Sequence, residues 1–281
     1  MWIRPHLSSS PSLLGEGDRA KRGGGEIPSP HCPSTAPLRG AVPLPETSSG
    51  RNSGWLLLLP LLLAACQEKT EESPFPKPKR PVSPIVSASY SNEDARDSVR
   101  EAETVMDLAD IEAGMYVADI GAGEGYYTVR LAPLVGRKGR VLAQDIVPET
   151  RDALANRVTR EDLHNVAVKL GKPNDPLLPD GSFDRVFMIH MYHEIERPSE
   201  FLWNLRPDLR KNGRVVVVDA DRPTDRHGTP PRLLICEFAA VGYQLTRFER
   251  LQDSESYFAQ FDPSGARPEP KDIPVCPAAA G

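Results

Sequence analysis

Four side chains that could move a proton lie within five positions of one another. They are His190, Tyr192, His193 and Glu194. They stand at the end of the stretch 178–190, which reads as a strand and its approach. Histidine titrates near neutral pH and could act as a general base, and a tyrosine hydroxyl could orient an acceptor. We therefore take all four as catalytic candidates. The alternative for a histidine is that it packs against or caps the following helix.

A metal site is a weaker use of the same cluster. His190, His193 and Glu194 could together hold an ion, but no further ligand from another strand or loop is evident, so we predict no metal site. A second polar cluster, 219–227, follows a later predicted strand and could close over an acceptor. A polar surface loop is an equal alternative for that segment.

The four cysteines, Cys32, Cys66, Cys236 and Cys276, show no metal-ligand spacing. They fall in segments of different character, so we expect neither a disulfide framework nor a structural zinc site. Cys236 lies in a predicted helix, where the expected role is that of a small buried hydrophobic side chain.

A glycine-rich segment forms the second group of residues that could do chemistry. It reads Asp119-Ile-Gly-Ala-Gly-Glu-Gly125 and begins within the short apolar stretch 116–120. The glycines let a ligand approach the backbone without meeting a Cβ atom. Their spacing differs from the G-x-G-x-x-G pattern that binds a dinucleotide pyrophosphate. An acidic residue here suits a ligand with an ammonium group, which Asp119 could attract directly or through water.

Asp145 closes the next predicted strand, 140–145, and lies 24 residues after Gly121. An acidic residue there can accept hydrogen bonds from both ribose hydroxyls of a bound nucleoside. Because NAD-dependent enzymes share this feature, Asp145 favours a nucleoside ligand in general. The alternative is an ordinary residue of a turn.

The elements that would position these residues alternate between helices and strands. A capping box at Ser91–Asp94 and apolar spacings of three and four predict a helix over 95–109. Strand, glycine loop, helix and strand from 116 to 145 form a βαβ unit, which favours a doubly wound α/β fold. Later helices are predicted at 198–210 and 231–241, and later strands at 165–170, 178–190, 214–219, 243–249 and 256–261.

Four segments in this order resemble class I (Rossmann-like) methyltransferases that depend on S-adenosylmethionine (SAM). They are V-A-D-I-G-A-G-E-G-Y-Y-T, R-V-L-A-Q-D-I-V-P-E, L-P-D-G-S-F-D-R-V-F-M-I-H and L-R-P-D-L-R-K-N-G-R-V-V-V-V-D, and the resemblance covers 107–219. It implies a mostly parallel seven-stranded sheet with helices on both faces, an antiparallel pair of last strands, and SAM as cofactor.

The resemblance also implies where the cofactor would bind. The glycine loop and Asp119 would line the methionine part, Asp145 would hold the ribose, and Asp175, with Asn174 next, would meet the adenine. The full predicted binding set is Asp119, Gly121, Ala122, Gly123, Gly125, Tyr126, Asp145, Ile146, Asn174 and Asp175.

The expected function is methyl transfer from SAM to an acceptor that the sequence leaves open. The glycine loop also resembles that of protein L-isoaspartate methyltransferases, but the stretch after 178–190 does not follow their pattern. Two other functions remain as alternatives. One is a non-catalytic, lipid-anchored module that binds SAM or another nucleoside, and the other is an NAD-type oxidoreductase, against which the loop spacing argues. The net charge of −5 gives no indication of nucleic-acid binding, and the oligomeric state stays open.

The chain around this domain has a different character. Residues 1–50, rich in Pro, Ser, Gly and Arg, read as a disordered extension or as sequence upstream of a true start near Val42 or Leu44. Residues 51–66 read as a signal segment and 67–90 as a Pro-rich linker that forms an extended tether. The methyltransferase domain is expected over 91–262 and a disordered tail over 263–281.

The apolar run Trp55–Ala65 is too short to span a bilayer but suits the core of a signal peptide. Its end, Leu63-Ala-Ala-Cys66, resembles a bacterial lipoprotein signal. That resemblance implies a lipid anchor on Cys66 and a membrane-bound protein facing the periplasm. A cytoplasmic protein is the alternative, since SAM is made in the cytoplasm.

Overall fold

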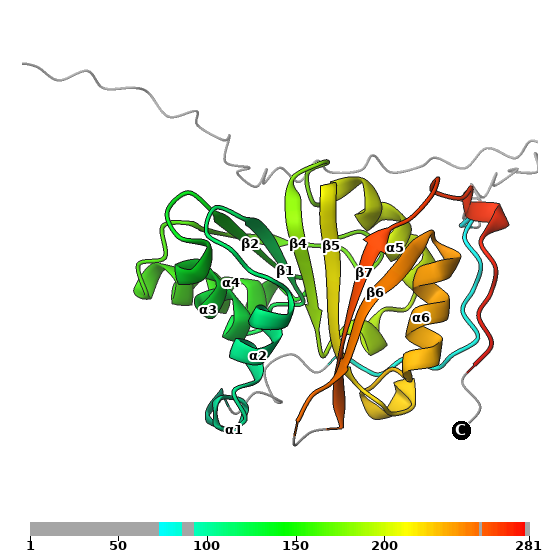
Figure 1. Cartoon of the computed structure of the whole chain (residues 1–281), viewed down its shortest axis with the longest axis horizontal. Helices are drawn as coiled ribbons and strands as arrows, with labels where there is room; N and C mark the ends of the chain where they lie inside the picture. The colour runs from blue at the N-terminus through cyan, green and yellow to red at the C-terminus, as the bar shows by residue number, and fades with distance from the viewer. Residues whose placement is uncertain (1–72, 86–92, 253–254, 279–281) are drawn as a thin grey trace, which may run out of the picture. The chain divides into compact units, whose positions relative to one another are not determined.

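The computed structural model describes residues 73–85, 93–252 and 255–278, and a seven-stranded sheet organises this part of the chain (Figure 1). The strands are β1 Tyr116–Ile120, β2 Arg140–Asp145, β3 Val166–Leu170, β4 Phe183–Ile189, β5 Leu209–Ala220, β6 Tyr243–Arg250 and β7 Ser256–Pro263. Their order across the sheet is β3-β2-β1-β4-β5-β7-β6. The first five are parallel, and β7 is antiparallel to β5 and β6. The predicted fold class is therefore confirmed.

Helices cover both faces of the sheet, because successive strand side chains point to opposite faces. Val117 packs with α2 and α3 on one face, and the next residue, Ala118, packs with α5 and α6 on the other. The helices are α1 Glu93–Ser98, α2 Glu101–Leu108, α3 Tyr126–Val135, α4 Pro148–Arg160, α5 Pro198–Leu205 and α6 Pro231–Ala240, with 3₁₀ turns η1 Tyr192–Glu194, η2 Arg206–Asp208, η3 Thr224–Arg226 and η4 Pro270–Asp272.

Several elements differ from the sequence-based expectation: α4 is not among the predicted helices, β4 begins later than expected and α5 ends earlier. Two further differences have a local backbone cause. The predicted helix over 95–109 is two helices, since Arg100 between them takes a left-handed backbone conformation with φ of 52°. Strand β5 begins at Leu209, before the break expected at 212–213. A Cβ atom on Gly213 would lie 2.5 Å from the carbonyl oxygen of Phe183, so glycine permits close pairing with β4 at an irregular register.

Residues 73–85, which we call the N-terminal strap, lie against the domain, whereas the sequence predicts an extended tether. Arg80 is buried and its Nε donates to Glu237 Oε1 at 2.9 Å. Its Nη2 donates to the carbonyl oxygen of Ile195 at 3.0 Å. The proline-rich composition predicts an extended chain, but it does not reveal that one buried ion pair fixes that chain in place.

The C-terminal segment is also ordered against the domain, so the tail predicted to be disordered is wrong over 264–278. Trp203 Nε1 donates to the carbonyl oxygen of Pro268 at 2.8 Å, and Ile273 is buried. Cys236 on α6 forms a disulfide with Cys276, which corrects the expectation that disulfides are absent. The two cysteines come together only because the tail folds back along α6, which sequence spacing does not show.

Several predictions concern other parts of the chain. The predicted extension, the signal segment and Ser91 of the capping box lie outside the described residues. Among the helices of the described residues, none has the length and apolar character that crossing a membrane requires.

Candidate cofactor and active site

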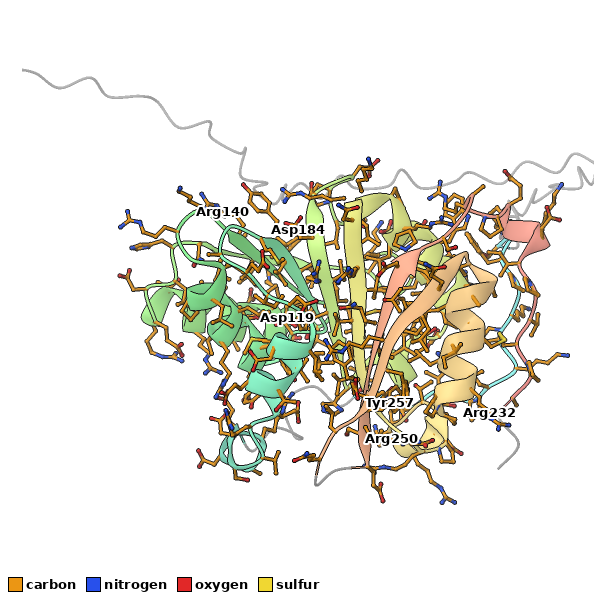
Figure 2. The ribbon with its side chains drawn as sticks, viewed as in Figure 1. Asp119, Arg140, Asp184, Arg232, Arg250 and Tyr257 are labelled. Carbon is orange, nitrogen blue, oxygen red and sulfur yellow. A yellow bond between two sulfur atoms is a disulfide. The ribbon has the colours of Figure 1, made fainter. Side chains whose placement is uncertain are left out.

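A cavity of about 350 Å³ opens at the carboxyl ends of the parallel strands. In Figure 2, Arg140 and Asp184, near the beginnings of β2 and β4, lie toward the upper edge of the sheet, and Tyr257, paired with the end of β5, lies toward the lower edge. Ligands of doubly wound folds bind beyond the strand ends where this cavity lies. Its walls come from the glycine loop, the ends of β2 and β4, the segment after β3, and the strap.

The glycine loop and Asp145 are joined by a hydrogen bond at the cavity wall. Gly123 N donates to Asp145 Oδ2 at 3.1 Å, and Val147 N donates to Asp145 Oδ1 at 2.9 Å. Gly123 has a φ of 55°, and a Cβ atom there would meet no protein atom within 4 Å. The loop therefore presents bare backbone to the cavity, and the fixed carboxylate keeps lone pairs for a ligand.

Asp119 lies beneath the loop and does not line the cavity. Its side chain is buried, and Oδ2 accepts a hydrogen bond from Thr128 Oγ1 at 2.6 Å. Burial raises the pKa of Asp119 to about 6. In this position the Asp119 carboxylate does not contact the cavity, in contrast to the predicted direct contact with a ligand ammonium group. A contact through water stays a prediction.

The structure brings the remaining predicted cofactor residues to different places. Gly121, Ala122, Tyr126 and Ile146 line the cavity. Gly125 does not: it stands directly before α3 with φ of 90°, and a Cβ atom there would lie 2.4 Å from Leu154 Cδ1. This glycine serves packing between α3 and α4.

The two predicted adenine contacts lie outside the cavity lining, which Lys172 and Pro173 form instead. Asn174 Nδ2 donates to Glu200 Oε1 at 2.5 Å, and Asp175 Oδ1 accepts from Leu177 N at 2.7 Å. Both side chains thus stabilise the loop after β3. The sequence alone does not show which polar side chains of this loop contact a ligand and which stabilise the turn.

Gln144 is a cavity residue that sequence reasoning missed. Its side chain is buried, and neither Nε2 nor Oε1 has a hydrogen-bond partner among the described residues. Buried amides without partners are costly, so a ligand that bonds to this amide would stabilise it. Glutamine near a strand end carries no recognisable signal in the sequence.

Tyr192 and His193 do not line the cavity, in contrast to the catalytic role predicted for them. Tyr192 is fully buried, and its hydroxyl donates to Glu237 Oε2 at 2.9 Å. His193 is buried as well, with Nδ1 at 3.0 Å from Asp219 Oδ1. The η1 turn at this point rotates successive side chains to different sides, which a count along the sequence cannot anticipate.

His190 and Glu194, the other two catalytic candidates, do line the cavity. His190 Nε2 lies 3.4 Å from Glu101 Oε1. Burial alone would raise the pKa of Glu101, but hydrogen bonds and charges from His190 and Arg96 outweigh burial and lower that pKa to about 2. A carboxylate that stays ionised therefore stands beside the imidazole. Glu101 comes from α2, and nothing in the sequence linked it to His190.

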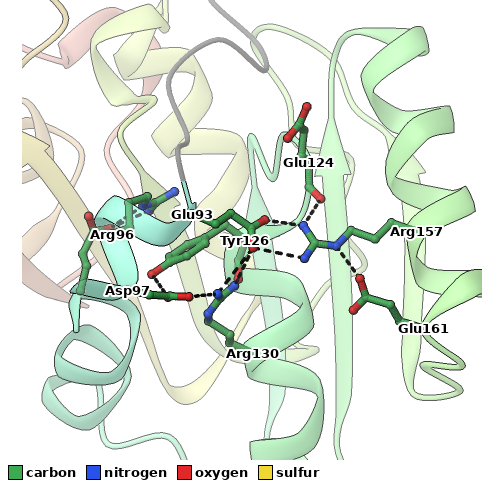
Figure 3. A network of polar contacts seen from close by, with 9 residues as sticks. Glu93, Arg96, Asp97, Glu124, Tyr126, Arg130, Arg157 and Glu161 are labelled. Atoms are coloured by element: carbon green, nitrogen blue, oxygen red, sulfur yellow. Dashed lines mark hydrogen bonds and ion pairs between the residues drawn. The ribbon is translucent and has the colours of Figure 1, made fainter. Parts of the chain in front are cut away.

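A polar network holds α1 and α2 over the glycine loop (Figure 3). Arg96 and Arg130 both lie over the ring of Tyr126, with guanidinium-to-centroid distances of 3.8 and 3.9 Å. Arg157 of α4 joins Glu93 Oε1 at 2.5 Å and donates to the carbonyl oxygen of Glu124 at 3.0 Å. One guanidinium thus connects α1 to the glycine loop.

Comparison with known proteins agrees with this architecture. Residues 118–217 match a family model described as a methyltransferase domain. A SAM-dependent methyltransferase from Aquifex aeolicus has the same fold, with a TM-score of 0.56 and 24% identity, covering 59% of this chain and 92% of that chain. A [4+2]-cyclase, SpnF, shares the fold at 13% identity with a TM-score of 0.54, covering 68% of this chain and 89% of that chain. The fold alone therefore does not fix a reaction.

Curated relatives are similar over the same region. The protein-L-isoaspartate O-methyltransferase of Methanococcoides burtonii is 32% identical over 111 residues, which are 40% of this chain and 52% of that protein. The demethylmenaquinone methyltransferase of Listeria monocytogenes is 24% identical over 155 residues, 55% of this chain and 65% of that protein. The chain thus spans about half the length of the first of these relatives. Together with the strand order, these similarities show that the domain has the fold of class I methyltransferases and that its residues 118–217 are similar to a methyltransferase domain.

Proposed function

We propose that this protein transfers a methyl group from SAM to an acceptor that binds in the same cavity. The observation that carries the proposal is the fixed pair of Gly123 N and Asp145 in the cavity wall. The backbone of 121–123 would hold the methionine part, Asp145 the ribose and the unpartnered amide of Gln144 a polar edge of the base. When bound, SAM supplies an activated methyl group, so the protein must mainly align the acceptor.

His190 is the residue we propose as proton acceptor in this reaction. Glu101 beside Nε2 favours the tautomer protonated on that nitrogen, which leaves Nδ1 to take a proton from an acceptor hydroxyl or amine. Glu194 lines the same cavity and could fix the acceptor. Tyr192 and His193 have no direct part in this scheme, since both lie outside the cavity lining.

Calorimetry with S-adenosylhomocysteine (SAH) and NAD on the full chain tests the proposal. We expect SAH to bind and Asp145→Ala to weaken it at least about tenfold, because one hydrogen-bonded carboxylate is worth about 1.5–3 kcal/mol. Asp152→Ala is the matched control, since Asp152 is exposed on α4 and does not line the cavity. Selective binding of NAD, or SAH affinity that Asp145→Ala leaves unchanged, would refute the assignment.

We further propose that the protein is a lipoprotein of the bacterial envelope, attached through Cys66. The lipoprotein-like segment before Cys66 supports this location, and so does the Cys236–Cys276 disulfide, since disulfides persist mainly in oxidising compartments. Labelling with radioactive palmitate followed by membrane fractionation tests the anchor. We expect label on the full chain and none on Cys66→Ser; equal label on both would exclude Cys66 as the site.

The same location favours a second candidate function, a SAM-binding module without turnover. SAM is made in the cytoplasm, so an exported domain would need a supply from elsewhere. The two candidates differ in one measurement, the formation of SAH from SAM in the presence of envelope extract. His190→Ala should abolish that formation if the protein is an enzyme, and no SAH should form at all if it is a binding module.

A further inference from the structure

A cluster of three possible metal ligands lies beside the cavity and shares only Glu194 with the proposed methyl transfer. It consists of His193 and Glu194 in η1 and His227 in the loop after η3. One ligand atom from each side chain lies within 4.8 Å of the other two. The sequence had suggested His190 as the partner of His193 and Glu194, but His190 lies beside Glu101. The sequence-based argument against a metal was that no ligand from another strand or loop was evident. In the structure, His227 is such a ligand.

The orientation of His193 is typical of a metal ligand. Its Nδ1 lies 3.0 Å from Asp219 Oδ1, and the Asp219 side chain is wholly buried. Asp219 is held in turn by Thr229 Oγ1, which donates at 2.7 Å, and by the backbone N of Ala220 at 2.9 Å. Histidines that bind metals usually donate their other ring N–H to such a carboxylate. With Nδ1 engaged by Asp219, the nitrogen that would meet an ion is Nε2.

His227 is held in an unusual conformation by the N-terminal strap. Its backbone lies in the left-handed region with φ of 54°, which is costly for a residue other than glycine. Ser83 Oγ of the strap accepts from His227 N at 3.1 Å and donates to the carbonyl oxygen of Thr224 at 2.5 Å. Thr224 Oγ1 donates back to the carbonyl oxygen of Pro81 at 2.7 Å. The strap thus fixes the loop so that the His227 ring stands perpendicular to that of His193, 5.5 Å away.

We propose that His193, Glu194 and His227 form a binding site for a divalent transition-metal ion of the Zn²⁺ type. Two imidazoles and one carboxylate are ligands that such ions prefer, whereas Mg²⁺ and Ca²⁺ prefer oxygen ligands alone. Two acidic side chains, Glu194 and Asp219, stand at the site, in keeping with the double charge of the ion. That match limits the cost of placing the ion next to buried groups.

The geometry requires only a small closure. Tetrahedral bonds of about 2.0–2.2 Å place ligand atoms roughly 3.3–3.6 Å apart, so separations of up to 4.8 Å must shrink by at most about 1.5 Å. Rotation of the Glu194 side chain can supply that movement, because this residue is only partly buried. Glu194 also lines the cavity, so the ion would lie at the cavity rim with its fourth position open to water or to an acceptor oxygen.

Metal titration of the full chain, without an affinity tag and stripped with a chelator, tests this site. Co²⁺ binding is followed by its visible absorption, and Zn²⁺ binding by calorimetry. We expect one ion per chain and at least about tenfold weaker binding for Glu194→Gln and for His227→Asn, which keeps a residue tolerant of the left-handed conformation. His164→Ala is the matched control, since the His164 side chain is 85% exposed and belongs to no such cluster.

Two results would overturn the site. One is the absence of stoichiometric binding of Co²⁺ or Zn²⁺ at micromolar concentrations. The other is binding that Glu194→Gln and His227→Asn leave unchanged, which would mean that the ion sits elsewhere. His193→Ala is judged only together with these variants, because His193 is buried and its loss could unfold the loop. The titration needs no SAM, so its outcome is separate from that of the proposed methyl transfer.

Discussion

Tyr192 and His190 are neighbours in sequence but face different surroundings, and their substitutions should separate folding from chemistry. Tyr192→Phe removes a buried hydroxyl that donates to Glu237 Oε2. We expect a loss of about 1–3 kcal/mol in the free energy of unfolding, because a buried carboxylate loses a donor. Urea titration measures this loss. SAH affinity and turnover per folded molecule should stay unchanged, since Tyr192 does not line the cavity.

His190→Ala is the counterpart of Tyr192→Phe. This histidine lines the cavity and is partly exposed, so its removal should reduce turnover. Its φ is 54°, so the variant whose unfolding free energy should stay near that of the parent is His190→Asn, since asparagine tolerates the left-handed conformation. A Tyr192→Phe protein that is fully stable but inactive would contradict this division and return Tyr192 to the active site.

Asp119 should leave a signature in the pH dependence of stability. Burial raises its pKa to about 6 in the folded state, against 3.8 for an unperturbed aspartate. Asp119 therefore stays protonated to a higher pH in the folded state than in the unfolded state. For this reason the free energy of unfolding falls as the pH rises from about 4 to 6. The difference of about 2 pH units corresponds to about 3 kcal/mol.

Comparing Asp119→Asn with the parent isolates this contribution, because other carboxylates titrate in both proteins. Asparagine can still accept from Thr128 Oγ1, and it does not ionise. The stability of the variant relative to the parent should increase by about 3 kcal/mol between pH 4 and 6, measured by urea titration. A constant difference across this range would show that Asp119 titrates at an ordinary pKa in the folded protein.

Residues differ in how far their roles could be predicted from the sequence. The roles of Asp145 and Gly123 are predictable, because each residue follows a recognisable strand and the glycine spacing is visible in the local sequence. Gln144 is not, because its amide reaches the cavity past Gly171, where a Cβ atom would lie 1.2 Å from Gln144 Nε2. Glu101 is not either, since its contact with His190 depends on how α2 packs against the sheet.

At the scale of elements, the N-terminal strap should contribute to stability through Arg80. This guanidinium pairs with Glu237 Oε1 at 2.9 Å, and both side chains are almost wholly buried. Arg80→Ala leaves the Glu237 carboxylate buried without its cation, which costs about 3–5 kcal/mol. Urea unfolding should show that loss. Lys79→Ala, at an exposed position next to it, should show almost none.

A double substitution checks the cause of the loss at Arg80. Glu237→Gln removes the stranded charge while keeping an acceptor for the Tyr192 hydroxyl. The pair Arg80→Ala with Glu237→Gln should therefore be more stable than Arg80→Ala alone. If the double variant is instead as unstable as the sum of its parts, the strap acts through packing and not through this ion pair.

The regular elements were predictable where hydrophobic periodicity and turn residues agree. The strands at 116–120 and 140–145 have the predicted bounds, because Gly121 follows the first and Gly139 precedes the second. The positions of the strap and of the C-terminal segment could not be predicted, since their few buried side chains lie among prolines and charged residues. Their order depends on partners far away in the sequence, such as Glu237 and Cys236.

At the scale of the whole molecule, the strap and the C-terminal segment both attach to α6, through Glu237 and through Cys236. The strap also fixes the loop that carries His227. The segment that would follow a lipid anchor is therefore part of the domain's own packing. Disulfide formation and completion of the proposed metal site are thus linked through one region of the fold.

The disulfide gives the last test, because it separates stability from ligand binding. Cys236 and Cys276 are 40 positions apart, and closing a loop of that size stabilises a folded chain by about 3–4 kcal/mol. Cys276→Ser should lower the unfolding free energy by about that amount. A thiol reductant should bring the parent to the same value and leave the variant unchanged. SAH affinity should not change, since neither cysteine lines the cavity. A parent that keeps its stability under reductant would mean that the C-terminal segment is held by its packing alone, and the disulfide would then no longer support an oxidising location.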